Sequence, residues 1–302
     1  MTETAPAPTT HTLRTSEAEL VYDVRGDLGT ATADRPALLA VGTPMDARGF
    51  ATLAGHFADR PVITYDPRNV GRSRRQDPDR TPAPEDHAAD LHALITELGV
   101  GPVDVFGSSG GAVNALALAA AHPEDLRTVV AHEPPAGGAL PDADAVRAAC
   151  RAVHARYQRA GSGVGMASFI LLVSHQGPFP TDWADGPDPD PAMFGMPAGD
   201  DGRRDDPLMA NMLTIPVWAP DVDRLRTAGC RVVLGVGAES GETLAARAPR
   251  AIAEQTGRDL VVFPGDHTGF AGGEFGQVGE PDAFAARLHE VLDRWAHPRS
   301  VR

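Results

Sequence analysis

A five-residue pattern, glycine-x-serine-x-glycine, constrains this chain more than any other feature. Ser109 is its centre, in the run Gly107-Ser-Ser-Gly-Gly111. The apolar residues 103–106 precede it, and residues 112–121, a strong helix former, follow it. This context predicts a strand, a tight turn and a helix, in which the glycines allow a strained turn that lifts the serine above the sheet edge. We therefore interpret Ser109 as a nucleophile, and Ser108 as the variable position before it.

Short apolar runs recur along the rest of the chain and alternate with helical patterns. The runs lie at residues 36–41, 61–65, 102–106, 127–131, 231–236 and 260–263. Two sets of apolar side chains each share one helical face: Leu91, Leu94, Ile95 and Leu98, and then Phe284, Leu288, Leu292 and Trp295. Residues 11–15 and 19–25 predict an opening antiparallel pair of strands. This alternation predicts an α/β fold with a mainly parallel sheet covered by helices on both faces.

The alternation breaks between about residues 141 and 228, where Pro- and Asp-rich segments follow two helical stretches. Such segments cannot form a core by themselves. We therefore expect residues 141–228 to form a cap, inserted into a core made of residues 11–140 and 229–302. The Pro-, Thr- and Ala-rich residues 1–10 are expected to be disordered.

Size and charge exclude several classes of function. The 302 residues include 27 basic and 41 acidic side chains and no Lys/Arg block, so neither nucleic acid nor an anionic membrane is an expected partner. A small-molecule substrate fits better. The two cysteines, the N-terminus without an apolar stretch, and apolar runs far short of a membrane span of roughly 20 residues predict a cytoplasmic location. We find no closely spaced His, Asp and Glu ligand set, and expect neither metal nor cofactor; the oligomeric state stays open, with a homodimer among the options.

His267 is the candidate general base. It lies in a glycine-flanked loop between the last apolar run, residues 260–263, and the C-terminal helical pattern. A base that reaches a serine from a neighbouring strand end belongs in such a loop. The adjacent Asp266 is poorly placed to orient its neighbour's ring, and we interpret it as a residue that shapes the loop.

With these residues in place, the chain resembles the α/β-hydrolase superfamily, and more narrowly the actinobacterial alpha/beta fold hydrolases. Beyond the serine pattern, the resemblance rests on Tyr65-Asp-Pro-Arg-Asn-Val-Gly-Arg-Ser73 and His132-Glu-Pro-Pro135, and it covers about residues 13–295. It implies a three-layer α/β-hydrolase fold with an inserted helical cap and a serine nucleophile, but no substrate. Asn69 stands where the family's turn usually has glycine, and asparagine tolerates a left-handed conformation. Val41-Gly42 replaces the His-Gly of many relatives.

Acyl transfer also needs two hydrogen-bond donors directed at the oxyanion. The natural pair is the amide of Gly110, directly after the nucleophile, and one amide from the loop at residues 42–45. Pro44 has no N–H to donate. Thr43 is therefore the first candidate and Met45 the second.

Glu133, at one strand end, and Glu239 or Glu242, near another, are candidates for the acid that orients the histidine. Superfamily members commonly place an aspartate three residues after the glycine that is here Gly237; Ser240 holds that position, with Glu239 and Glu242 beside it. Some relatives, such as one branch of the haloalkane dehalogenases, carry the acid at the end of the preceding core strand, where Glu133 stands. Glu133 and Glu239 both satisfy the chain order, so the choice stays open. The acid would fix the imidazole tautomer and stabilise the imidazolium.

A serine nucleophile favours acyl transfer over dehalogenation or epoxide opening, which in similar enzymes proceed through an aspartyl ester. We expect hydrolysis of a carboxylic ester, lactone or thioester of a fairly apolar small molecule. Apolar side chains of the cap are candidates for binding it: Phe169, Leu172, Met193, Phe194, Met212 and Trp218. The acidic cap loops disfavour strongly anionic substrates. Two alternatives remain: another chemistry on the same residues (a perhydrolase, a carbon–carbon bond hydrolase or a non-hydrolytic biosynthetic enzyme), and a non-catalytic small-molecule binder.

Overall fold

A single central sheet organises the chain, of which the computed structural model describes residues 7–77 and 80–293. The strand order is β1-β2-β4-β3-β6-β7-β8-β9, and the short β5 pairs with β2. The strands are β1 (Thr9–Arg14), β2 (Ala18–Arg25), β3 (Leu38–Val41), β4 (Val62–Tyr65), β5 (Arg74–Arg75), β6 (Val103–Ser108), β7 (Leu126–His132), β8 (Arg231–Gly237) and β9 (Asp259–Phe263). The six strands from β4 to β9 in this order are parallel, and β1, β2 and β5 pair antiparallel. The expected mainly parallel sheet is confirmed.

The central strands are buried along their whole length. In the register of the sheet, Val105 of β6 lies between Leu39 of β3 and Val129 of β7, and all three side chains are fully buried. A parallel sheet that is covered on both faces has near-continuous apolar strands. This explains why these strands are visible in the sequence as uninterrupted apolar runs.

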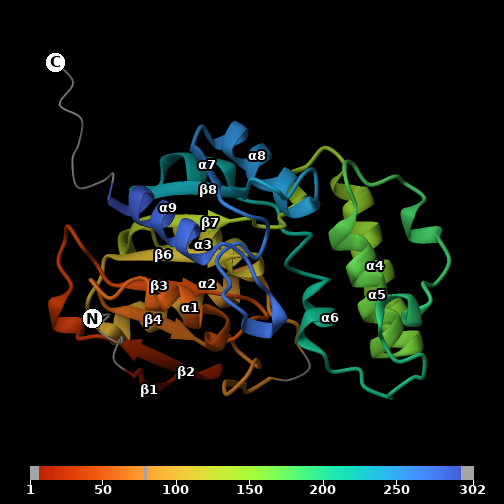
Figure 1. The fold of residues 1–302 in the computed structure, drawn as a ribbon, viewed down its shortest axis with the longest axis horizontal. Coiled ribbons are helices and arrows are strands. Elements are labelled where there is room, and N and C mark those ends of the chain that lie inside the picture. The colour runs from red at the N-terminus through yellow and green to blue at the C-terminus, as the bar shows by residue number, and fades with distance from the viewer. Residues whose placement is uncertain (1–6, 78–79, 294–302) are drawn as a thin grey trace.

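Helices cover both faces of the sheet (Figure 1). They are α1 (Ala51–Gly55), α2 (Pro84–Leu98), α3 (Gly110–Ala121), α4 (Ala143–Ala160), α5 (Ser162–Ser174), α6 (Pro207–Asn211), α7 (Val222–Thr227), α8 (Leu244–Thr256) and α9 (Pro281–Asp293). Leu91 of α2, Leu116 of α3 and Ile252 of α8 belong to one apolar cluster. Leu53 of α1 and Leu288 of α9 belong to another, on the opposite face. The three-layer arrangement is therefore the one that the alternating pattern predicts.

Helices α4, α5 and α6, which we call the insertion helices, lie between β7 and β8 in the chain and pack in a separate apolar cluster, which also includes Leu140, and Leu244 of α8. Figure 1 shows α4 and α5 side by side, away from the sheet. Their cluster includes Val146 and Tyr157 of α4, Leu172 of α5 and Met209 of α6. Helix α7 differs, because its Leu225 is fully buried in the cluster of α3 and α8. Helix α7, although within the expected cap of residues 141–228, therefore packs with the core helices.

The N-terminal segment departs from expectation. Disorder was expected over residues 1–10, but Thr9 and Thr10 begin β1 and pair with Val24 and Asp23. The hydroxyl of Thr10 donates a hydrogen bond to Oδ1 of Asp23, at 2.6 Å. An exposed edge strand needs backbone pairing rather than apolar side chains, so composition alone misses it. Residues 1–6 and Trp295 lie outside the described residues.

The structure also describes the turn at Asn69 and the two cysteines. Asn69 has a φ of 62°, which is the left-handed conformation that its turn was expected to require. Cys150 and Cys230 are both buried and unpaired.

Over residues 7–77 and 80–293, no helix combines the length and the apolar character needed to cross a membrane.

Candidate active site

Ser109 lies at the junction of β6 and α3 in a strained backbone conformation. Its φ is 56° and its ψ is −125°, a region that non-glycine residues rarely adopt. The Ser109 amide donates a hydrogen bond to the carbonyl oxygen of His132, at 3.0 Å, which holds the turn against the end of β7. Strain of this kind persists only where the surrounding structure enforces it, and it is concentrated at functional sites.

The glycines on either side of Ser109 have a steric role. A Cβ atom on Gly107 would lie 2.8 Å from backbone atoms of Gly111 and Ala112. A Cβ atom on Gly111 would lie only 2.0 Å from the carbonyl oxygen of Val41 in β3. Helix α3 can therefore start directly over β3 and β6 only because both positions lack a side chain.

Glu133 directly follows β7 and its side chain is fully buried. Its Oε2 lies 2.7 Å from Nδ1 of His267, and its Oε1 accepts a hydrogen bond from the amide of Gly237 at 2.8 Å. Its own amide donates to the carbonyl oxygen of Gly235, at 3.0 Å. Glu133 has a positive φ of 50°. Backbone and carboxylate are thus both fixed against the end of β8, with one oxygen directed at the imidazole.

The electrostatics keep this carboxylate ionised. Burial by itself raises the pKa of Glu133, but the hydrogen bond with His267 and the electrostatic interactions with His267 and the nearby His132 lower the pKa to about 2. The neighbouring His132 is fully buried, and burial lowers its pKa to about 4. At neutral pH the site therefore pairs an ionised Glu133 with His267, beside a neutral His132.

The other candidate acids do not hold this bond to His267. The side chain of Glu239 is exposed, and its backbone amide donates to the carbonyl oxygen of Gly265 at 3.0 Å. Glu242 lies 3.3 Å from the guanidinium of Arg250. Asp266 accepts hydrogen bonds from the amide and the hydroxyl of Thr268, at 2.8 and 2.9 Å, and so caps its own loop. Of the carboxylates considered from the sequence, Glu133 is the one that reaches the imidazole.

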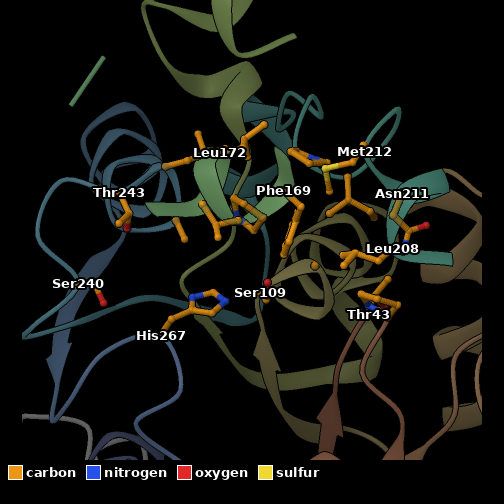
Figure 2. Close-up of a pocket in the computed structure, with 18 of the residues that line it drawn as sticks. Thr43, Ser109, Phe169, Leu172, Leu208, Asn211, Met212, Ser240, Thr243 and His267 are labelled. Carbon is orange, nitrogen blue, oxygen red and sulfur yellow. The ribbon is translucent and has the colours of Figure 1, made fainter. Parts of the chain in front are cut away.

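Ser109 and His267 line the same cavity, whose volume is about 380 Å³. Figure 2 shows His267 and Thr43 on opposite sides of Ser109, with Phe169 and Leu172 above. The imidazole is partly exposed to the cavity, since 40% of its side-chain surface is accessible. A serine hydroxyl at a helix N-terminus and an imidazole held by a carboxylate are groups that acyl transfer uses.

Thr43 and Gly110, the two expected oxyanion donors, also line the cavity and are in close contact. A Cβ atom on Gly110 would lie 2.5 Å from the carbonyl oxygen of Thr43. Nδ2 of Asn114 in α3 donates to the Thr43 hydroxyl at 2.8 Å, which connects this loop to the helix that follows Ser109. Met45 instead packs against Gly49, where a Cβ atom would lie 2.2 Å from its sulfur. The second candidate, Met45, is therefore absent from the cavity lining.

Three of the six expected substrate-binding side chains line the cavity: Phe169, Leu172 and Met212. The other three do not. Met193 is 80% exposed, and Phe194 is half-buried in a short 3-10 helix at Pro191–Phe194. Trp218 packs on the main core, and its Nε1 donates to Glu85 at 2.8 Å. Apolar composition does not distinguish a cavity wall from an exposed turn or a contact with the core.

Other lining residues escaped the sequence analysis. Leu208 and Asn211 of α6 and Ile215 just after it lie in the segment of the expected cap that contains Met212. Leu244 belongs to α8, outside the expected cap, and Gln176 follows α5. For Leu208, Asn211 and Ile215, the apolar stretch at residues 208–217 was the one sequence signal available. No sequence signal points to Leu244, because only the packed structure brings α8 to the cavity.

Comparisons with known proteins find a matching family and similar folds. Residues 38–160 match the family described as "alpha/beta hydrolase fold". The chain is 27% identical over 294 residues to the uncharacterized hydrolase YraK of Bacillus subtilis (strain 168), covering 94% of this chain and 96% of that protein. Two solved structures share the fold: a thermophilic esterase from Thermogutta terrifontis (TM-score 0.65, 20% identity, 97% and 100% of the two chains) and a putative epoxide hydrolase from Pseudomonas aeruginosa (TM-score 0.64, 18% identity, 97% and 99%).

Proposed function

Because the chain belongs to the α/β-hydrolase superfamily and is an enzyme of the hydrolase type, we propose that it cleaves a carboxylic ester, lactone or thioester of an apolar small molecule through an acyl-enzyme on Ser109. The observation that carries this proposal is the 2.7 Å contact of the Glu133 carboxylate with His267, beside the cavity that Ser109 lines. The esterase from Thermogutta terrifontis, which has the same fold, supports an ester as the substrate class.

In the first half of the reaction, Oγ of Ser109 attacks the carbonyl carbon and Nε2 of His267 takes the hydroxyl proton. Nδ1 of His267 is committed to Glu133, so Nε2 is the nitrogen left for proton transfer. The amides of Gly110 and Thr43 stabilise the tetrahedral oxyanion. His267 then returns the proton to the leaving alcohol or thiol, and the bond to the leaving group breaks.

In the second half, water attacks the ester on Ser109 while His267 accepts a proton from that water. Collapse of the new tetrahedral intermediate breaks the bond to Oγ, and the proton returns to Ser109. The carboxylic acid leaves. Glu133 stays ionised throughout, in keeping with its low pKa, and stabilises the imidazolium in both halves.

The cavity favours an uncharged apolar acyl group. Its walls include Phe169, Leu172, Leu208 and Met212, from the insertion helices and the residue that follows them. We propose that these helices act as a cap over Ser109. A volume of about 380 Å³ lies at the lower end of the usual range for small-molecule pockets, roughly 300–1,000 Å³.

A fluorophosphonate probe tests this proposal directly. The probe phosphorylates an activated serine, so the folded protein should be labelled once, and peptide mapping should find the label on Ser109. The same reaction with Ser109→Ala should give no label. A folded wild-type protein that resists labelling would favour the alternative of a non-catalytic binder, and a label on another serine would show that the nucleophile is wrong.

A further inference from the structure

Three potential metal ligands come together just before β7 begins, at the opposite end of α3 from Ser109. His92 lies on α2, His122 directly follows α3, and Asp125 ends the 3-10 turn Pro123–Asp125. One ligand atom from each of the three lies within 4.8 Å of those from the other two. No closely spaced ligand set was found in the sequence, and these three residues are not all close together along it. His92 is 33 residues from Asp125 in sequence, so spacing alone could not reveal the cluster.

The contacts within the cluster are close. Nδ1 of His92 lies 2.7 Å from Oδ2 of Asp125, and the rings of His92 and His122 stack with centroids 3.9 Å apart. Nδ1 of His122 lies 3.4 Å from Oε1 of Glu124. The turn fixes part of this geometry, because the amide of Asp125 donates to the carbonyl oxygen of His122 at 3.2 Å. Two imidazoles and a carboxylate are thus held at one point between two helices.

We propose that His92, His122 and Asp125 bind one divalent transition-metal ion of the Zn²⁺ type. Imidazole nitrogen and carboxylate oxygen are ligands that Zn²⁺ and its neighbours in the series prefer. At bond lengths of about 2.0–2.2 Å, tetrahedral ligands lie about 3.4 Å apart. Binding would therefore lengthen the 2.7 Å separation of His92 and Asp125 and shorten the longer separations in the cluster, which are at most 4.8 Å. Side-chain exposures of 39% for His92 and 32% for His122 leave both rings room to turn and leave space for water as the fourth ligand.

The proposed ion would connect two helices and would take no part in the reaction. It would connect α2 to the turn that follows α3, whereas Ser109 precedes the first residue of α3. The 12 residues of α3 span about 18 Å, which separates the two sites. An ion that binds only the folded chain raises stability with its concentration. Zn²⁺ should therefore raise the melting temperature without being needed for turnover.

The test uses the full chain without a polyhistidine tag, stripped with EDTA and dialysed. Isothermal titration with Zn²⁺ should give one site per chain, and Co²⁺ should give the visible absorption of a tetrahedral complex. His122→Ala and Asp125→Asn should each weaken Zn²⁺ binding by more than about tenfold, since loss of even an outer partner typically costs 10–100-fold. Both variants should lose the rise in melting temperature.

His56→Ala is the matched control, because His56 also pairs with a carboxylate, at 3.4 Å from Asp282, but is not part of the cluster. It should bind Zn²⁺ as the wild type does. Asp125→Asn is nearly isosteric and carries the test if His122→Ala fails to fold. The proposal is overturned if the wild type binds no Zn²⁺ at millimolar concentration, or if Asp125→Asn and His56→Ala bind it equally.

Discussion

His267 and Glu133 lie 134 residues apart in sequence, yet Nδ1 of one is 2.7 Å from Oε2 of the other. The pair forms because Glu133 leaves β7 with a φ of 50° and is held by backbone bonds to β8. Ser109, at the end of the adjacent β6, has a φ of 56°. Two neighbouring strands therefore end in non-glycine residues with strained backbones, and both residues contribute to one site. This coincidence is the geometric reason to expect catalysis there.

Ser109→Ala should abolish hydrolysis of a short-chain nitrophenyl ester. Without the hydroxyl no acyl-enzyme forms, and kcat should fall by about 10⁵-fold or more. Steady-state kinetics measure the effect, and circular dichroism checks that the variant is folded. Ser108→Ala is the matched control: the neighbouring hydroxyl is buried in β6, outside the cavity lining, and its loss should leave kcat close to that of the wild type. Equal losses in the two variants would contradict the assignment.

Glu133→Gln should lower kcat by about 10³–10⁴-fold. The amide keeps the size of the side chain but cannot stabilise the imidazolium, and it favours the wrong tautomer of His267. Glu239→Gln should change kcat little, because Glu239 is exposed and does not hold the imidazole. Comparing kcat for the two variants on one neutral ester is the measurement. Mild, equal losses would mean that neither residue is the acid.

Local pattern was enough to predict the parallel sheet and the strained serine turn, because both depend on neighbouring residues. The choice between Glu133 and Glu239 could not be made in the same way. It depends on the backbone of one residue after β7 and on which strand end the His267 loop approaches. Leu244 and the metal-ligand cluster were missed for a related reason, since packing alone brings such residues together.

Gly111→Ala should destabilise the protein strongly. The new Cβ would lie 2.0 Å from a carbonyl oxygen of β3, which cannot turn away as a side chain can. We expect a loss of more than about 3 kcal/mol in the free energy of unfolding, at the upper end of overpacking effects. Gly55→Ala is the control. It also adds a Cβ atom to a glycine in a helix, but that atom would have no neighbouring atom within 4 Å. It should be neutral or stabilising by up to about 1 kcal/mol in urea unfolding.

His132 should make the protein sensitive to acid. Burial lowers its pKa from 6.5 to about 4, so the folded protein stays unprotonated at this ring while the unfolded chain takes up a proton below pH 6.5. Stability from this residue is therefore present above pH 6.5 and is lost as pH falls toward 4, by up to about 1.4 kcal/mol per pH unit. Urea unfolding from pH 7 to 4 should show a shallower loss in His132→Leu. Burial also lowers the pKa of His87, to about 3, so His132→Leu should still lose the part of its acid stability that depends on His87.

The enzyme should prefer neutral esters to anionic ones of the same size. Glu239 and Asp266 both line the cavity, and the whole chain carries a net charge of −14. Like charges repel an anionic acyl group, and salt screens that repulsion over about 10 Å at 0.1 M.

We therefore expect kcat/KM for a hemisuccinate ester to be well below that for the matched butyrate ester. The ratio of kcat/KM for the butyrate ester to that for the hemisuccinate ester should fall toward one as salt is raised and in Glu239→Gln. Ser108→Ala should leave this ratio unchanged. A ratio near one at low salt would show that these carboxylates do not select the substrate.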